Sequence, residues 1–130
     1  MRINDQNYVD EAECVILKLK GLKNKADKPI PLVTTSKIRN LLAMTADIYN
    51  QVMNQTTDKL DEEVCGRIDY LRIRFLYEAG RDENVKNLVN EARLIEILKE
   101  INGSKKNYIT FSRYMEALVA FRKFHGGRDE

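Results

Sequence analysis

Apolar residues recur every three or four positions along most of the chain, which is the spacing of one face of an α-helix. The first such stretch, residues 5–22, carries Tyr8, Ala12, Val15, Ile16 and Leu19. No stretch shows the strict alternation of polar and apolar residues that a half-buried β-strand requires. The pattern therefore predicts an all-α protein.

Two prolines interrupt the helical pattern after this first stretch. Pro29 and Pro31 lie in the segment 23–32, where they cannot continue a helix and favour an extended path. The first helix alone could not bury its apolar face, so we interpret the segment as a hinge or connector and not as a domain boundary. Its length also permits two copies of the chain to exchange their first helices.

Residues that favour helix ends divide the remainder of the chain. A second helix is expected to start near Thr35 or Ser36 and to run to about Asn54. Its predicted apolar face consists of Ile38, Leu41, Leu42, Thr45, Ile48, Tyr49 and Val52. A third helix is expected to be capped by Asp58, to run to Ala79 and to end at Gly80. Its predicted core face consists of Val64, Ile68, Leu71 and Phe75.

The next helical stretch, residues 84–101, follows an expected cap at Asp82 and changes phase near Arg93. This change predicts either a kink or two short helices. Ser104 is expected to cap a last helix that runs to about His125 and is closed by the glycines at 126 and 127. Together these stretches predict one domain, a bundle of five or six helices. Residues 1–33 would form the first helix and its connector, and residues 34–127 the main bundle.

Composition agrees with a soluble globular protein. Of the 130 residues 32% are charged, the mean hydropathy is −0.49 and the net charge is +2. The polar start of the chain, Met1 to Asn7, does not resemble a secretory signal. No apolar run approaches the roughly 20 residues needed to span a bilayer. These features predict a cytoplasmic protein with no membrane contact.

The sequence offers little chemistry for catalysis. It has no Gly-rich phosphate loop, no nucleophile elbow and no paired histidines. Cys14 and Cys65 match no metal or redox spacing, and we expect both to be reduced, mostly buried thiols. The carboxylate pairs Glu62/Glu63 and Asp82/Glu83 fall at predicted helix starts, where the macrodipole favours them. We expect no catalytic residue, no metal, no cofactor and no small-molecule substrate.

Arginine and tyrosine alternate along one side of the third predicted helix. The five residues Arg67, Tyr70, Arg74, Tyr77 and Arg81 have the spacing i, i+3, i+7, i+10, i+14, which forms one continuous row. Guanidinium groups bind phosphate oxygens with two parallel hydrogen bonds, and tyrosine offers a hydroxyl or a stacking plane. The row therefore suits a nucleic-acid backbone. In the alternative interpretation, the tyrosines lie at the edge of the core and the arginines pair with Glu63 and Glu78.

The C-terminal part of the chain is basic. Residues 103–128 contain one acidic residue, Glu116, against Lys105, Lys106, Arg113, Arg122, Lys123 and Arg128. Aromatic residues are interleaved with them, but Phe111, Met115, Leu118 and Arg122 share one face and are expected to be largely core. This positive element suits either nucleic acid or an acidic protein surface.

Three segments carry a resemblance to a known family: TTSKIRNLL (residues 34–42), YLRIRFLYEAGR (70–81) and YMEALVAFRKFHGG (114–127). In order and spacing they resemble the small α-helical subunit of the type III-A CRISPR-Cas Csm effector complex. The resemblance implies a helical bundle that occurs in several copies, stacked as a filament against the guide RNA–target RNA duplex. It further implies contacts with the backbone and large subunits of the complex. Those two subunits would carry the catalytic activities, and the small subunit none.

The resemblance adds Lys37 and Arg39 to the candidate RNA-binding residues. On a helical projection they flank the apolar face on opposite sides, so we expect one to face RNA and the other a neighbouring subunit. The complete candidate set is Lys37, Arg39, Arg67, Tyr70, Arg74, Tyr77, Arg81 and Arg113. The leading hypothesis is a non-catalytic subunit that grips the RNA backbone without reading base sequence. The alternatives are a purely structural helical adapter and an enzyme with an acidic site.

Overall fold

Six helices form between residues 1 and 126, the part of the chain that the computed structural model describes. They are α1 (Tyr8–Lys20), α2 (Thr35–Asn54), α3 (Glu62–Arg81), α4 (Glu83–Glu91), α5 (Leu94–Ile101) and α6 (Lys105–His125). No strand occurs among these residues, so the predicted all-α class is confirmed. The expectations that involve Gly127 and Arg128 lie outside the described residues.

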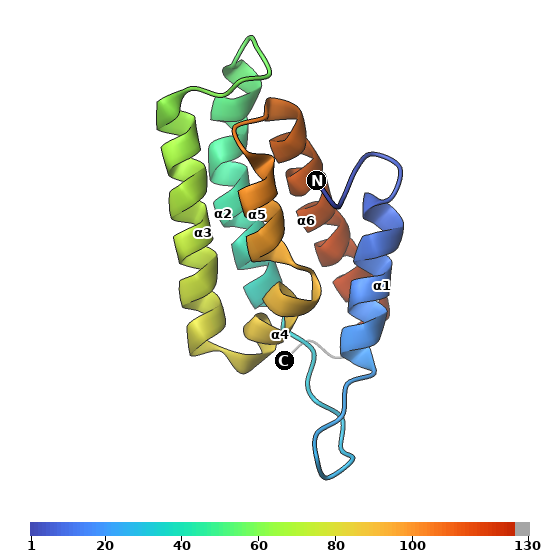
Figure 1. Cartoon of the computed structure of the whole chain (residues 1–130). Helices are drawn as coiled ribbons and strands as arrows, with labels where there is room; N and C mark the ends of the chain where they lie inside the picture. The colour runs from blue at the N-terminus through green and yellow to red at the C-terminus, as the bar shows by residue number, and fades with distance from the viewer. Residues whose placement is uncertain (127–130) are drawn as a thin grey trace.

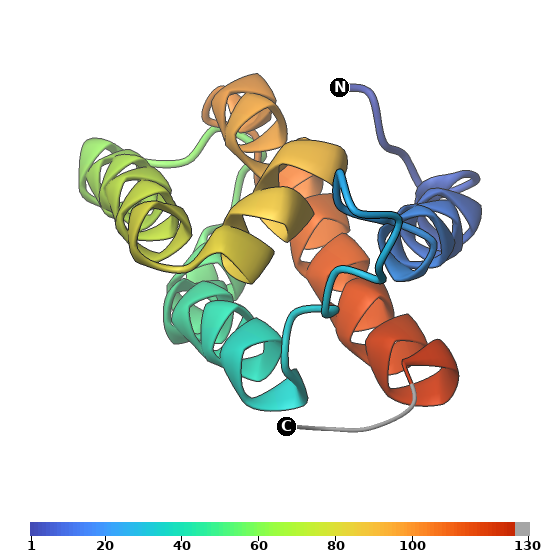
Figure 2. The same cartoon turned by 90° about the horizontal axis from the view of Figure 1, so that it is seen from below.

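Four of the helices lie side by side in the order α3, α2, α6, α1, and α4 and α5 cover one side of this row (Figures 1 and 2). Helix α6 packs against α1, α2 and α5, and is therefore the central helix of the molecule. Helices α2 and α3 form an antiparallel hairpin (Figure 1). As a result α1 and α3 are the two outermost members of the row.

Side-chain caps begin four of the helices. Thr34 accepts from the N–H of Lys37, Asp61 from that of Val64, Asp82 from those of Asn84 and Val85, and Ser104 from that of Asn107. The predicted caps Asp82 and Ser104 are confirmed. Helix α2 begins at Thr35 as expected, but its cap is Thr34 and not Thr35 or Ser36. The predicted start of α3 is displaced, because Asp61 and not Asp58 caps that helix.

Asp58 has a different role, which explains the displaced start of α3. Its carboxylate accepts hydrogen bonds from the Ser104 hydroxyl at 3.0 Å and from the Lys106 N–H at 2.9 Å. These bonds tie the α2–α3 loop to the start of α6. They also hold the pKa of Asp58 below its usual range, chiefly through the Lys106 N–H. A long-range partner thus outweighs the local capping preference.

Helix α3 does not end at Gly80 as predicted, but continues to Arg81 because Asp82 begins α4 directly. Neither Gly66 nor Gly80 has the positive φ that favours glycine. A Cβ atom added to either residue would meet no atom within 4 Å. The fold of the single chain therefore requires glycine at neither position.

The predicted phase change near Arg93 is a break between two short helices. Arg93 adopts a left-handed conformation, with φ 58° and ψ 37°, between α4 and α5. The break turns Leu94, Ile97 and Leu98 of α5 toward the core, where all three are buried. The two-helix alternative is therefore the correct one.

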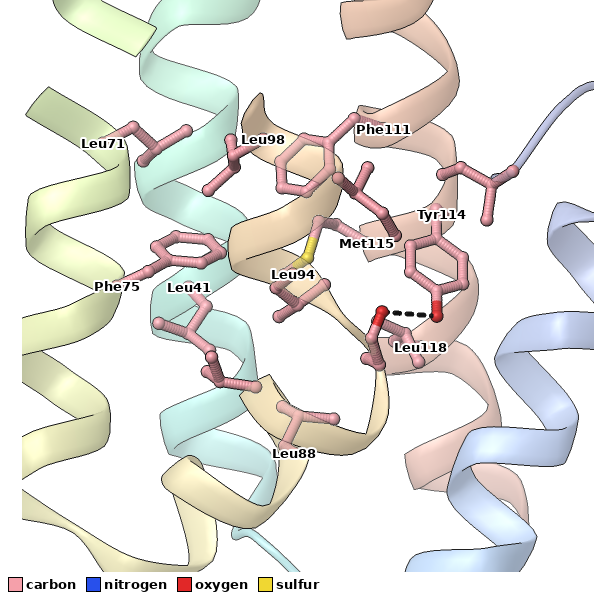
Figure 3. Close-up of a cluster of buried hydrophobic side chains, with 14 of the residues drawn as sticks. Leu41, Leu71, Phe75, Leu88, Leu94, Leu98, Phe111, Tyr114, Met115 and Leu118 are labelled. Atoms are coloured by element: carbon pink, nitrogen blue, oxygen red, sulfur yellow. Dashed lines mark hydrogen bonds between the residues drawn. The ribbon is translucent and has the colours of Figure 1, made fainter. Parts of the chain in front are cut away.

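The core gathers apolar side chains from all six helices, and part of it is shown in Figure 3. The predicted core faces of α3 and α6 are buried without exception, including Arg122 at the end of α6. The Nε–H of Arg122 donates to the carbonyl oxygen of Val33, which ties α6 to the connector before α2. The expectation of two mostly buried thiols is wrong for Cys14, which is exposed; Cys65 is half-buried, and both are free.

Two buried tyrosines of α6 join that helix to its neighbours. The Tyr108 hydroxyl donates to the carbonyl oxygen of Thr45 in α2 at 2.6 Å. The Tyr114 hydroxyl donates to that of Ala92, at the α4–α5 break, at 3.0 Å (Figure 3). Burial raises the pKa of both phenols well above the usual range, because the phenolate would lose its hydration.

We expect these phenols to make the fold sensitive to alkali. Because each folded pKa lies above the unfolded value, the unfolded chain loses the protons first as the pH rises. The free energy of unfolding should then fall by about 1.4 kcal/mol per pH unit and per phenol above about pH 10. Denaturant melts from pH 8 to 11 on wild type and on a Tyr108→Phe/Tyr114→Phe double variant measure this slope. In the variant, the part of this pH dependence that the two phenols cause should be absent. The same dependence of the free energy of unfolding on pH in both proteins would contradict the raised pKa of these phenols.

Candidate nucleic-acid interface

The arginine–tyrosine row of α3 lies on the surface of the molecule. All five of its residues are exposed, with Tyr70 at 59% and Tyr77 at 61%. The alternative that these tyrosines lie at the core edge is therefore wrong. Among the residues that the structure describes, neither Arg67 nor Arg74 forms an ion pair with Glu63 or Glu78. Only Arg81 approaches Glu78, with 4.0 Å between Nη1 and Oε1.

The first part of the row faces a narrow groove between α3 and α2. Arg67, Tyr70 and Arg74 form one wall, and Met44 and Asp47 of α2 form part of the other. The Nη1 group of Arg67 donates to Oε1 of Gln51 on α2. This bond holds one end of the guanidinium fork while the side chain stays exposed. Arg67 is therefore oriented before any ligand arrives, which lowers the entropic cost of binding.

The second part of the row continues to the end of α3. The guanidinium of Arg81 lies over the ring of Tyr77, with 5.6 Å from Cζ to the ring centroid. Such a cation–π contact leaves the N–H groups at the edge of the guanidinium free for an anion. Stacking and phosphate binding are thus compatible in this pair.

Arg81 also borders an open cleft of about 680 Å³ beside the start of α2. The cleft walls include Lys37 and Arg39 of α2 and Glu78 and Asp82. Lys37 and Arg39 therefore line one cleft, although the helical projection separated them. The structure brings both residues of α2 close to the α3 row.

The two residues differ in what they contact. The Lys37 ammonium donates a hydrogen bond to the Asp82 carboxylate, which also accepts from the N–H groups of Asn84 and Val85 as the cap of α4. The Lys37 hydrogen bond is the largest of the effects that lower the pKa of Asp82. Arg39 is exposed, and among the described residues it has no ion pair. Lys37 thus stabilises the start of α4, and Arg39 is available to a ligand.

Arg113 lies apart from the other candidates. It is exposed on α6 and lines a separate depression with Lys106 and with Thr56 and Thr57 of the α2–α3 loop. Helix α2 lies between α6 and the α3 row (Figure 2). The structure therefore gathers seven of the eight candidate residues along α3 and its cleft with α2, and leaves Arg113 outside.

Sequence reasoning missed the two partners that orient this surface, Gln51 and Asp82. The pairs Gln51–Arg67 and Lys37–Asp82 are both centred near Lys59, in the turn of the α2–α3 hairpin. Folding the two helical patterns antiparallel about that turn would have placed each partner opposite its cation. The sequence therefore contains the information that identifies Gln51 and Asp82, but only once α2 and α3 are paired as an antiparallel hairpin.

Neither a group of metal-ligating side chains nor a helix able to span a membrane is found among the described residues. Within residues 1–126, no three His, Cys, Asp or Glu side chains lie together in a way that could hold a metal ion. In the same range no helix combines the length and apolar character needed to cross a membrane.

Comparison with known proteins gives one consistent family. Residues 16–128 match the family model described as Csm2 Type III-A. The chain is 42% identical over 127 residues to "CRISPR system Cms protein Csm2" of Streptococcus thermophilus, with 98% of each chain covered. It is 35% identical over 130 residues to the protein of the same name from Mycobacterium tuberculosis (strain CDC 1551 / Oshkosh), with both chains fully covered. A third relative of that name, from Enterococcus italicus, is 35% identical over 96 residues, which cover 72% of this chain and 68% of the relative.

The different contacts of Lys37 and Arg39 can be tested by titration. A Lys37→Met substitution should raise the pKa of Asp82 toward its usual value, whereas Arg39→Met should leave it unchanged. A carboxyl group with a lowered folded pKa stabilises the fold above its unfolded pKa, and this contribution disappears as the pH falls through the folded value. The loss in Lys37→Met should be below about 1 kcal/mol because the Lys37 side chain is 54% exposed and its charge is screened by solvent. NMR titration of the Asp82 carboxyl measures the effect; equal shifts in both variants would refute the assignment.

Proposed function

This chain belongs to the Csm2 type III-A family, and on that basis we propose that it is the small subunit of a type III-A CRISPR complex. In this role it holds the backbone of the guide RNA–target RNA duplex through basic contacts that do not depend on base sequence. Several copies stack along the duplex and contact the backbone and large subunits of the complex. The subunit itself is non-catalytic.

The observation that carries the RNA-binding role is the exposed row on α3. Three arginines alternate with two tyrosines along one rigid helix, and Arg67 and Arg74 have no acidic partner among the described residues. Successive arginines are seven residues apart, which is about 10 Å along a helix axis. A row of this kind can follow a phosphate backbone over several nucleotides.

Binding to the backbone suits a duplex whose sequence varies from one guide to the next. Phosphate contacts position a protein on nucleic acid but carry no sequence information. The shape and backbone of an A-form duplex can be recognised without contacts to base edges. Arginines held by side chains of the same chain, as Arg67 is by Gln51, meet this need without a cofactor.

The cleft beside α2 extends the same surface. We assign the RNA contact there to Arg39 together with Arg81, because the Lys37 ammonium is already bonded to Asp82. In this proposal Lys37 acts as a positioning residue that holds the start of α4. Arg113 is a secondary candidate, since it lies in a separate depression beside Lys106.

A purely structural adapter is the alternative function. It is favoured by the large apolar side chains that α3 exposes beside the arginine row, among them Ile73 at 57% and Leu76 at 52%. An adapter would use these side chains, and the arginines as well, for protein contacts alone. The two functions differ in whether RNA affinity depends on the arginines.

Charge reversal on α3 should weaken RNA binding and leave the fold intact. For an Arg67→Glu/Arg74→Glu variant we expect at least a tenfold loss of affinity for a labelled RNA duplex of arbitrary sequence, on the order of 1.4 kcal/mol. The slope of log affinity against log salt concentration should fall by about 1.5 to 2, because two phosphate contacts are lost. Fluorescence anisotropy at several salt concentrations measures both quantities.

A Lys86→Glu/Lys99→Glu variant is the matched control. It makes the same change in net charge at two exposed lysines of α4 and α5, away from the arginine row. It should keep the wild-type salt slope and lose little affinity. If both variants lose RNA affinity equally, the interaction depends only on the net charge of the protein. If neither variant loses affinity, the structural adapter is favoured.

A further inference from the structure

The cleft between the end of α3 and the start of α2 contains a carboxylate that phosphate binding does not explain. Glu78 lies on α3 three residues before Arg81, and both line the cleft together with Arg39 of α2. The Glu78 side chain is 19% exposed, compared with 62% for Arg81. A half-buried negative charge repels the phosphates that neighbouring arginines attract. A cleft that bound phosphate alone would be weakened by this residue.

The fold of the single chain does not use the oxygens of Glu78. Within residues 1–126 its carboxylate accepts no hydrogen bond, and the 4.0 Å from Oε1 to Nη1 of Arg81 is too long for one. Asp82, the other carboxylate of the cleft, accepts from the Lys37 ammonium and from two backbone N–H groups at the start of α4. Glu78 is therefore the cleft carboxylate whose oxygens are open to a donor on a ligand.

The sugar–phosphate backbone of RNA carries one kind of group that fits such a carboxylate. An ionised carboxylate only accepts hydrogen bonds, and the phosphate and ring oxygens of the backbone are acceptors as well. The 2′-hydroxyl is the one donor of this backbone, and DNA lacks it. An amino group on a base edge is also a donor, but a contact with it would depend on base sequence. In a cleft that follows the backbone, the 2′-hydroxyl is the matching group.

The separation of Glu78 and Arg81 agrees with the arrangement of the two groups on RNA. In each ribonucleotide the 2′-hydroxyl lies next to the phosphate at the 3′ position of the same ribose. The carboxylate and the guanidinium lie 4.0 Å apart at neighbouring positions on one helix. The guanidinium is also held over the ring of Tyr77, which leaves its N–H groups available to phosphate. One nucleotide can therefore contact both side chains.

Ser36 and Asn40 also line the cleft, but they do not discriminate in the same way. A hydroxyl or an amide can donate to a phosphate as readily as it accepts from a sugar hydroxyl. Glu78 differs because a DNA backbone would remove its charge from water and offer no donor in return. Leaving a charged acceptor without a partner is costly. The carboxylate is therefore the group in this cleft that distinguishes the two backbones.

We propose that Glu78 accepts a hydrogen bond from a ribose 2′-hydroxyl and makes this surface selective for RNA. Arg81 binds the adjacent 3′-phosphate. The bond to the hydroxyl offsets the repulsion between Glu78 and phosphate, and a backbone without the hydroxyl receives the repulsion alone. Glu78 is thus a specificity-determining residue. The proposal rests on the proposed RNA-binding function and adds the chemical basis of its selectivity.

Duplexes that differ only at the 2′ position test this assignment. A 2′-fluoro duplex keeps the A-form shape but lacks the hydroxyl donor, so it separates the hydrogen bond from duplex shape. Wild type should bind RNA about three- to tenfold more tightly than the 2′-fluoro duplex of the same sequence. In a Glu78→Ala variant this ratio should fall to near one. Fluorescence anisotropy at a fixed salt concentration measures both affinities.

The ratio of the two affinities separates the hydrogen bond from the change in net charge. Glu78→Ala removes a negative charge, so its affinity for the 2′-fluoro duplex should rise, while its affinity for RNA changes less. Glu116→Ala is the matched control, because it removes the same charge from an exposed residue of α6. The control should keep the wild-type ratio. Glu78→Gln keeps a carbonyl acceptor and should give an intermediate ratio.

Several outcomes would overturn the role of Glu78. A wild-type ratio near one, or an unchanged ratio in Glu78→Ala, would leave Glu78 only as the counter-ion of Arg81. If RNA affinity still depends on Arg67 and Arg74 in that case, the proposed function stands and only the role of Glu78 fails. RNA affinity that does not depend on those arginines would remove the proposed function itself. A ratio that changes with base sequence would place a base amino group, and not the sugar, beside Glu78.

The carboxyl carbon of Glu78 gives a readout that does not depend on affinity. In ¹³C NMR spectra its signal should shift when the protein is saturated with RNA. Saturation with the 2′-fluoro duplex should leave the signal near its position in the free protein, because no donor reaches the carboxylate. Equal shifts with both duplexes would show that the carboxylate senses only the nearby phosphates, and would contradict the hydrogen bond.

Discussion

The burial of α6 between its neighbours is the constraint on which the rest of the structure depends. Its hydroxyl groups at Tyr108 and Tyr114 reach carbonyl oxygens of α2 and of the α4–α5 break. A buried hydroxyl without a partner would cost about 1–3 kcal/mol, so these bonds specify where the neighbouring helices can lie. With α6 at the centre, α1 and α3 need to bury only one face each. Both outer helices are left with surface that the fold itself does not use.

Helix α3 illustrates how that surface is divided. Its core face is buried, the side toward α2 carries arginines, and the outward side exposes the large apolar residues Ile73 and Leu76. Neither the exposed apolar side chains nor the glycines Gly66 and Gly80 stabilise the single chain, because exposed apolar area contributes nothing to folding and glycine weakens a helix. Selection for stability alone would replace both. The proposed RNA contact would account for the arginines on the side toward α2.

Features set by local chemistry could be predicted from the sequence, and features set by tertiary pairing could not. The phase change near Arg93 and the cap at Ser104 depend on a few neighbouring residues, and both were predicted. Asp58 seemed an equally good cap, but its carboxylate is engaged by the start of α6, which no local rule reveals. The row on α3 followed from helical spacing. The bond between Lys37 and Asp82, which distinguishes Lys37 from Arg39, becomes visible only once α2 and α3 are paired.

The most direct test of RNA binding by α3 is an NMR titration of the labelled protein with an RNA duplex of arbitrary sequence, repeated with an unrelated sequence. We predict that the arginine Nε–H signals of residues 67, 74, 81 and 39 shift together with the backbone amides of α3. The same signals should move with both sequences, because phosphates and not bases are contacted. Shifts confined to α1, α4 and α5, or a pattern that changes with the RNA sequence, would contradict backbone recognition by this helix.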